Sequence, residues 1–229
     1  MRAEGGTAVA NHDDVGDWTS CRRMVDQAVE EFGDLHAGIL IDAPLTEQHQ
    51  AMWERVLRVH LTGHAGLISA AGAYWRGRPR CDRSIVNSTS RVGMGGGSSG
   101  QSSYAAAKAA IAMLTLVVGN ELADQGVRCN AVAPSAVTRL ADAHSRMAER
   151  LVGMTHAERD RLGPASVAPL VVALAAADCE ITREIFYAGS GTVQRYSPWR
   201  AVGEITTEDI WTARQLATRL PELIASDSV

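Results

Sequence analysis

The sequence has few cysteines and no segment of concentrated charge, and each of these two shortages excludes a class of function. Its four cysteines, Cys21, Cys81, Cys129 and Cys179, lack the paired spacing of zinc or redox motifs, so we expect reduced thiols without a function. The formal net charge is -4, and the basic residues are scattered along the chain. We therefore expect no nucleic-acid partner and no binding to anionic membranes, because both need a concentrated positive surface.

Long hydrophobic runs and metal-binding patterns are also missing. The longest apolar run, residues 169–177, is too short to span a bilayer, and the first residues have no apolar core behind their single arginine. The seven histidines show no metal-ligand spacing. These absences predict a cytoplasmic protein without a metal site, whose partner is a small-molecule substrate.

The chain does contain alternating strand and helix patterns over 229 residues, 46% of them hydrophobic, which is typical of an α/β fold with a mainly parallel sheet. We predict strands at 7–11, 37–41, 84–90, 127–133 and 185–188, and helices at 21–32, 46–75, 104–122, from 166 onward and at 206–220. Gly33 follows the first helix as a C-cap, and Thr206 with Asp209 resembles a capping box for the last. We expect a single domain over 1–229, with 135–165 as substrate lid and 190–229 as C-terminal extension.

Three residues in the middle of the chain suggest acid-base chemistry. Tyr104 and Lys108 are four positions apart in a predicted helix, so their side chains lie on one face, one turn apart. A nearby ammonium favours a phenolate and typically lowers a tyrosine pKa of about 10 by roughly 1 to 3 units, which makes the phenol a usable acid or base. Ser90 ends the preceding strand, where open α/β sheets place their sites, and is expected to hydrogen-bond a substrate oxygen.

The setting of these residues resembles a known family. The run SIVNSTSRVGMGGGSSGQSSYAAAKAAIAML, followed by ELADQGVRCNAVAP, resembles the catalytic core of the short-chain dehydrogenase/reductase (SDR) family. This resemblance implies a Rossmann-like three-layer fold in which Tyr104 transfers the proton and Ser90 orients the oxygen. It further implies that Lys108 holds the ribose of NAD(P) and tunes Tyr104, and that Thr138 touches the nicotinamide amide.

Two further segments extend the resemblance. GGTAVANHDDVGDW is similar to the third strand of the family, which implies adenine contacts for Asp14 and Val15. RVHLTG resembles the segment that usually supplies a proton-relay asparagine, and His60 stands in its place as a further catalytic candidate. This histidine, together with ASVAPLVVALAAADCEITREIFYAGSG, is similar to the 3-hydroxyacyl-CoA and hydroxysteroid dehydrogenase subgroup. The implied substrates are hydroxyacyl thioesters or hydroxysteroid-like alcohols and ketones.

The chain departs from the family most at its beginning. No Gly-x-x-x-Gly-x-Gly turn precedes Gly5, so we expect an N-terminally truncated fold in which the first two βα units, about 50 to 60 residues, are absent. One extra residue separates Ser90 from Tyr104, and Ser135 stands where the family has glycine. NAD(P) is thus implied by resemblance, whereas its binding by this chain alone is not expected from the residues. The edges left open by the missing strands are expected to pair with each other, 7–11 beside 37–41, or with another chain.

A second glycine pattern offers an alternative nucleotide site. Gly95, Gly97 and Gly100 form G-x-G-x-x-G between a strand and a helix, but no acidic residue ends the next strand, so we favour a substrate-facing loop. Three functions stay open. The first is an SDR-type oxidoreductase, working as a homo-oligomer or with another SDR-like chain. The others are a cofactor-independent acid-base catalyst (isomerase, dehydratase or cyclase) and a non-catalytic subunit of a hetero-oligomer.

Overall fold

The structure, a computed structural model, describes residues 9–31, 45–97, 99–136, 154–155, 158, 161–197 and 199–225. The chain forms two compact units, Met1–Tyr196 and Ser197–Val229. The last strand of the first unit extends to Tyr196, past residue 190, where the C-terminal extension is predicted to begin. The site lies in the first unit.

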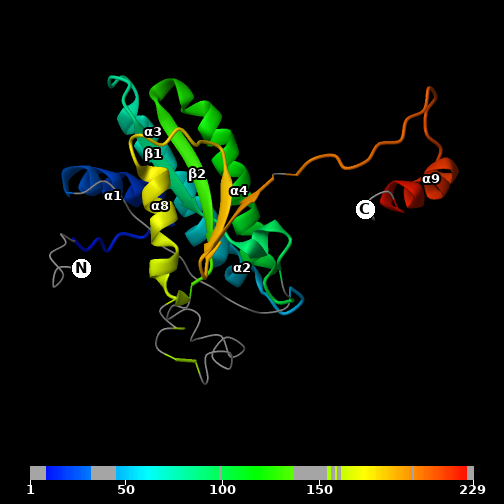
Figure 1. Cartoon of the computed structure of the whole chain (residues 1–229), viewed down its shortest axis with the longest axis horizontal. Coiled ribbons are helices and arrows are strands. Elements are labelled where there is room, and N and C mark those ends of the chain that lie inside the picture. Colours follow the sequence, from blue (N-terminus) through cyan, green and yellow to red (C-terminus); the bar gives the residue numbers. More distant parts are fainter. Residues whose placement is uncertain are drawn as a thin grey trace. The chain divides into compact units, whose positions relative to one another are not determined.

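The first unit is built on a four-stranded sheet in the order β1-β2-β3-β4 (Figure 1). The strands are β1 (Arg83–Ser88), β2 (Val127–Pro134), β3 (Ile185–Gly189) and β4 (Thr192–Tyr196). The first three are parallel, with Ser84 opposite Arg128 and Ala131 opposite Ile185, and β4 returns antiparallel to β3. The predicted α/β fold with a mainly parallel sheet is thus confirmed.

Helices cover both faces of the sheet (Figure 1). On one face, α4 (Ser102–Glu121) packs Ala112 against Ala131 and Ile185. On the other face, α8 (Ala168–Ala175) packs Leu174 in a cluster with β2 and β3 side chains. Every β2 side chain except the last is buried, because a central strand between two helix layers has no solvent face. By length and composition alone α4 could also cross a membrane, but here it is the core helix of this unit.

Two helical segments precede β1. The first, α1 (Trp18–Glu31), packs on α3 (Gly63–Trp75), where a Cβ at Gly66 would lie 2.6 Å from the Cys21 sulfur, so only glycine fits this contact. The second is continuous from α2 (Gln50–Leu57) through a π turn, η2 (Arg58–Thr62), into α3. The predicted helix at 46–75 is therefore confirmed from residue 50 onward, with a wider turn in its middle.

Two predictions about local structure differ from the structure, and one strand of the sheet was not predicted. Residues 9–11 form no strand, and 7–8 and 37–41 lie outside the described residues, so their predicted pairing is not tested. The final helix, α9 (Ala213–Ala225), begins later than predicted, because Thr212 and Gln215 form the capping box instead of Thr206 and Asp209. Strand β4 was not predicted. Most of the predicted lid at 135–165, including Thr138, is outside the described residues.

Candidate active site

Ser90 lies just beyond the carboxyl end of β1, as the sequence predicts. The strand direction continues through Thr89, whose backbone N–H donates to the Val132 carbonyl at 2.9 Å. Ser90 then has extended backbone angles and is the N-cap of a short 3-10 turn, η3 (Arg91–Met94), with its hydroxyl oxygen accepting the Val92 N–H at 3.3 Å. Its place at the carboxyl edge of a parallel sheet is where substrates bind in open α/β folds.

The turn η3 is pressed against α4 through Gly93. A Cβ at this glycine would lie 2.4 Å from the backbone nitrogen of Ala109 and 2.7 Å from the carbonyl carbon of Lys108, so no side chain fits there. After it, Gly96 donates its N–H to the Arg91 carbonyl at 2.9 Å, and Gly95 takes a φ of 91° that favours glycine. The glycines therefore serve a tight turn against the helix, which supports the active-site loop over a nucleotide-binding turn.

Helix α4 brings Tyr104 and Lys108 together. The Lys108 Nζ lies 5.7 Å from the centroid of the Tyr104 ring and donates a 2.7 Å hydrogen bond to the Ser88 carbonyl at the end of β1. The Thr89 hydroxyl in turn donates to the Lys108 carbonyl at 2.7 Å. These two bonds join the strand that leads to Ser90 to the turn of α4 that carries the lysine, and so fix the relative positions of the two elements.

Burial changes the acid-base behaviour of Lys108. The side chain is only 4% exposed, and this burial lowers its pKa from the ordinary 10.5 to about 8. An amine with a pKa near the working pH can gain or lose its proton at little cost, and in its charged form it favours a phenolate on the adjacent tyrosine. The pair is thus suited to moving a proton at a substrate oxygen.

His60 lies beside Tyr104 as a second neighbour. It is 2% exposed and sits in the π turn η2, a geometry that often occurs at functional sites. Its ring meets the Tyr104 ring edge-on, with centroids 5.2 Å apart and planes at 79°. Its carbonyl accepts a 2.6 Å hydrogen bond from the Nδ1 of His64. The structure therefore brings His60, Tyr104 and Lys108 into one group.

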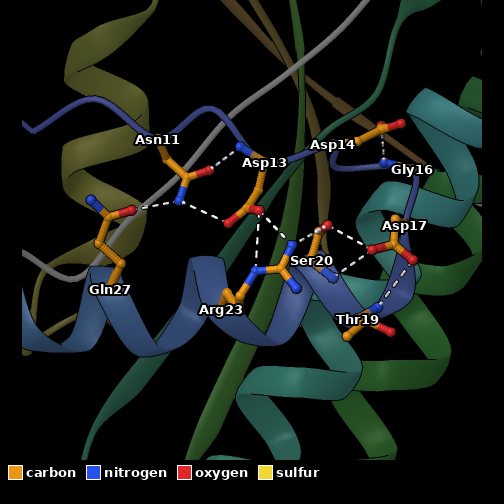
Figure 2. Close-up of polar contacts among 9 residues, drawn as sticks. All are labelled: Asn11, Asp13, Asp14, Gly16, Asp17, Thr19, Ser20, Arg23 and Gln27. Atoms are coloured by element: carbon orange, nitrogen blue, oxygen red, sulfur yellow. Dashed lines mark hydrogen bonds and ion pairs between the residues drawn. The ribbon is translucent and has the colours of Figure 1, made fainter.

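The segment with the two predicted adenine contacts is a structured loop before α1 (Figure 2). Asp14 accepts the Gly16 N–H at 2.8 Å and pairs with Arg58 at 2.5 Å, and the Arg58 guanidinium holds the pKa of this carboxyl below its usual value. Val15 packs against Gly63, where an added Cβ would lie 3.0 Å from a valine methyl. Asp17 is bonded to the N–H and hydroxyl of Ser20 and begins the helix.

The residues described here do not form a dinucleotide cradle. A pyrophosphate needs free backbone N–H groups at a glycine turn that opens a helix. The described glycine-rich segment is instead filled by its own turn and by α4, and both Asp14 oxygens are engaged. Lys108, the expected ribose contact, donates one of its three N–H groups to Ser88, and this bond does not decide whether a ribose binds. The predicted nicotinamide contact, Thr138, is outside the described residues.

Two cavities lie elsewhere in the first unit. One, of about 620 Å³, opens at the amino ends of the strands around Asp82, Arg128 and Cys179. The other, of about 250 Å³, lies between α3 and α4. Neither is lined by the proposed catalytic residues. Among the described residues, no group of His, Cys, Asp and Glu could hold a metal ion.

One residue near Ser90 was not anticipated. The guanidinium of Arg91 lies over the ring of Tyr187 in β3, 5.2 Å from its centroid, and so reaches across the carboxyl edge of the sheet. The signal in the sequence was an arginine directly after the candidate serine. Its partner could not be read from sequence, because the two residues are distant in the chain.

Comparison with known proteins finds dehydrogenases and reductases among the proteins that are similar to this chain. Residues 1–192 match the family model described as enoyl-(acyl carrier protein) reductase. The chain is 32% identical over 200 residues to a short-chain type dehydrogenase/reductase of Mycobacterium tuberculosis, covering 85% of this chain and 66% of that protein. It is 32% identical over 185 residues to the (3R)-3-hydroxyacyl-CoA dehydrogenase of Canis lupus familiaris, covering 77% and 70%.

A solved structure gives the same relationship. The short chain dehydrogenase from Mycobacterium avium superposes with a TM-score of 0.84 and 34% identity, over 98% of this chain and 76% of that chain. This chain also spans 22 to 46% of several multifunctional peroxisomal enzymes that it matches. It thus corresponds to part of its longer relatives.

Proposed function

This chain belongs to the short-chain dehydrogenase/reductase family, and on that premise we propose that it is an oxidoreductase acting on the carbinol or carbonyl carbon of a hydroxyacyl-thioester or hydroxysteroid-like substrate. The observation that carries the proposal is the buried Lys108 ammonium beside Tyr104. It is hydrogen-bonded to the carbonyl of Ser88, at the end of the strand that leads to Ser90. The similarity to the hydroxyacyl-CoA dehydrogenase of Canis lupus familiaris supports the substrate class.

The residues present account for the proton transfer. Tyr104 gives its phenolic proton to the substrate oxygen when a carbonyl becomes an alcohol, and takes it back in the opposite direction. Ser90 donates a hydrogen bond to the same oxygen, and the Lys108 charge stabilises the phenolate left on Tyr104. His60, packed edge-on against the phenol ring, restricts its orientation.

The family uses NAD(P) for the hydride, and this cofactor does not fit the described residues alone. The chain would therefore need a further polypeptide surface to complete the cradle. A second candidate function follows from the same observation: an acid-base catalyst that enolises or isomerises a ketone through Tyr104 needs no hydride and no dinucleotide.

One set of experiments separates the two functions. The purified chain is titrated with NADH and NADPH by fluorescence, and a 3-ketoacyl thioester is followed both for reduction and for deuterium exchange at its α carbon. Reduction with cofactor binding supports the oxidoreductase, whereas exchange without cofactor binding supports the acid-base catalyst. Tyr104→Phe should abolish whichever activity is found, and Tyr74→Phe, whose ring stacks with Arg78 outside the site, is the matched control. If the wild type shows neither reduction nor exchange, both functions are contradicted.

A further inference from the structure

Arg91 places a positive charge near Ser90, and the proposed proton transfer does not use this charge. It follows Ser90 directly, so the two Cα atoms are about 3.8 Å apart. Its guanidinium lies over Tyr187, on β3, 5.2 Å from the ring centroid. Residues of β3 alternate between the two faces of the sheet, and Ile185, two positions earlier, packs on the α4 side. Tyr187 and the Arg91 guanidinium therefore lie on the same side of the sheet as α4, which carries Tyr104 and Lys108.

The position of Arg91 is fixed by its backbone and by its platform. Its carbonyl accepts the Gly96 N–H at 2.9 Å, and a Cβ at Gly96 would clash with that oxygen at 2.9 Å. Gly93, in the same turn, contacts the backbone of α4 and so holds the turn against this helix. Tyr187 is 9% exposed, so the ring that supports the guanidinium is itself held by packing. A cation placed in this way loses little freedom when it binds a ligand.

Nothing in the described part of the chain neutralises this cation. The ion pairs found there use Arg23, Arg58, Arg128, Arg195 and Arg219. Arg91 has no carboxylate partner among those residues, and its side chain is exposed. A guanidinium offers a planar fork of donors that matches a carboxylate, and stacking on an aromatic ring leaves the edge of this fork free.

We propose that Arg91 binds a carboxylate of the substrate, so that the hydroxy or keto substrate carries a free carboxylate besides the group that reacts. The inference rests on the proposed function for the role of Ser90, which holds the reacting oxygen one residue away. A neutral analogue of the same shape binds without this contact.

The test measures binding without turnover, on the full chain. Calorimetric titration with 4-oxocyclohexanecarboxylate and with its methyl ester gives two dissociation constants. The wild type should bind the carboxylate about tenfold or more tightly than the ester, as expected for a charge-assisted hydrogen bond. Arg91→Met should abolish this preference, and Arg91→Lys should keep part of it. Arg78→Met removes a similar guanidinium-tyrosine contact outside the site, with the Arg78 guanidinium 4.0 Å from the Tyr74 centroid, and should keep the preference in full.

Several results would overturn the proposal. These are equal binding of acid and ester by the wild type, no binding of either, or a preference that survives in Arg91→Met. A loss of NADH affinity in Arg91→Met with an unchanged preference would assign the anion to the cofactor phosphates, and would also overturn it. If Arg91→Met does not fold, the wild type alone decides: its preference should shrink as sodium chloride rises from about 0.05 to 0.5 M, because salt screens an exposed ion pair. Absent turnover with an intact preference would contradict only the proposed redox function.

Discussion

The buried, charged Lys108 lowers the free energy of unfolding, and we expect this effect to appear as a pH dependence of stability. Burial lowers its pKa from 10.5 to about 8, so the unfolded chain holds the lysine proton more tightly than the folded protein does. Between pH 8 and 10.5 the unfolded state therefore binds more protons, and the free energy of unfolding rises with pH. Replacing the lysine by methionine removes this contribution.

The size of the effect follows from the shift. At about 1.4 kcal/mol for each pKa unit, the charged lysine costs the folded protein about 3.4 kcal/mol at pH 7. The cost falls to about 2 kcal/mol at pH 9 and to about 0.8 kcal/mol at pH 10, as the amine loses its proton in the unfolded chain too. The wild type should thus gain about 2.5 kcal/mol over Lys108→Met between pH 7 and pH 10.

Urea unfolding followed by circular dichroism measures this difference at each pH. Groups that titrate in the range and do not interact with Lys108, such as the Cys129 thiol, whose pKa burial raises to about 12, are common to both proteins and cancel in the subtraction. Lys108 is the only lysine in the sequence, so selective ¹³C labelling of lysine also gives its pKa directly by NMR. A stability difference that is flat from pH 7 to 10, or a measured pKa near 10.5, would refute the reasoning.

Three further substitutions test the packing of the site and of α1. Gly93→Ala should lower the free energy of unfolding by about 1 to 3 kcal/mol and reduce turnover, because its Cβ would meet backbone atoms of α4; unchanged urea denaturation would contradict this. Thr115→Val should cost about 1 to 3 kcal/mol in the same assay, because the Asn87 amide loses its 2.9 Å acceptor, whereas Thr115→Ser should cost less; equal losses would argue against the hydrogen bond. Asp17→Ala should lower the Tm at neutral pH, and this loss should shrink as the pH falls below 3.8. Hydrogen bonds from Ser20 lower this carboxyl's pKa below 3.8, so its stabilisation is complete above that value and is lost as the pH falls through the lower folded pKa; a Tm difference unchanged by pH would count against this.

The long elements could be predicted because their side-chain periodicity is strong. The helix around Tyr104 and the buried strand β2 are each packed against the core along their length, so the sequence must repeat its apolar residues at the matching interval. Strand β4 was missed because four of its five side chains are exposed and follow no alternation. Its signal was the turn before it, where Ser190 and Gly191 both have positive φ, as a two-residue hairpin turn requires.

Local patterns alone could not decide between equivalent alternatives. Thr206 with Asp209 and Thr212 with Gln215 have the same spacing, and only the second pair makes the reciprocal bonds of a capping box. Contacts between distant segments were likewise not predictable from sequence. The carbonyl of Ser88, a backbone group, is the hydrogen-bond acceptor for Lys108, and no residue pattern indicates a backbone acceptor.

The composition of the chain adds an argument for catalysis that the fold alone does not supply. Of 22 basic residues in the sequence, 21 are arginine, and the single lysine is the one buried beside Tyr104. A guanidinium in its place would stay charged at every accessible pH, whereas an amine changes its charge near neutrality once burial lowers its pKa. A purely structural cation at this point would gain from the extra hydrogen bonds of arginine. A lysine at this position costs the fold about 3.4 kcal/mol at pH 7, and it offers the proposed proton transfer a group whose charge can change near neutrality.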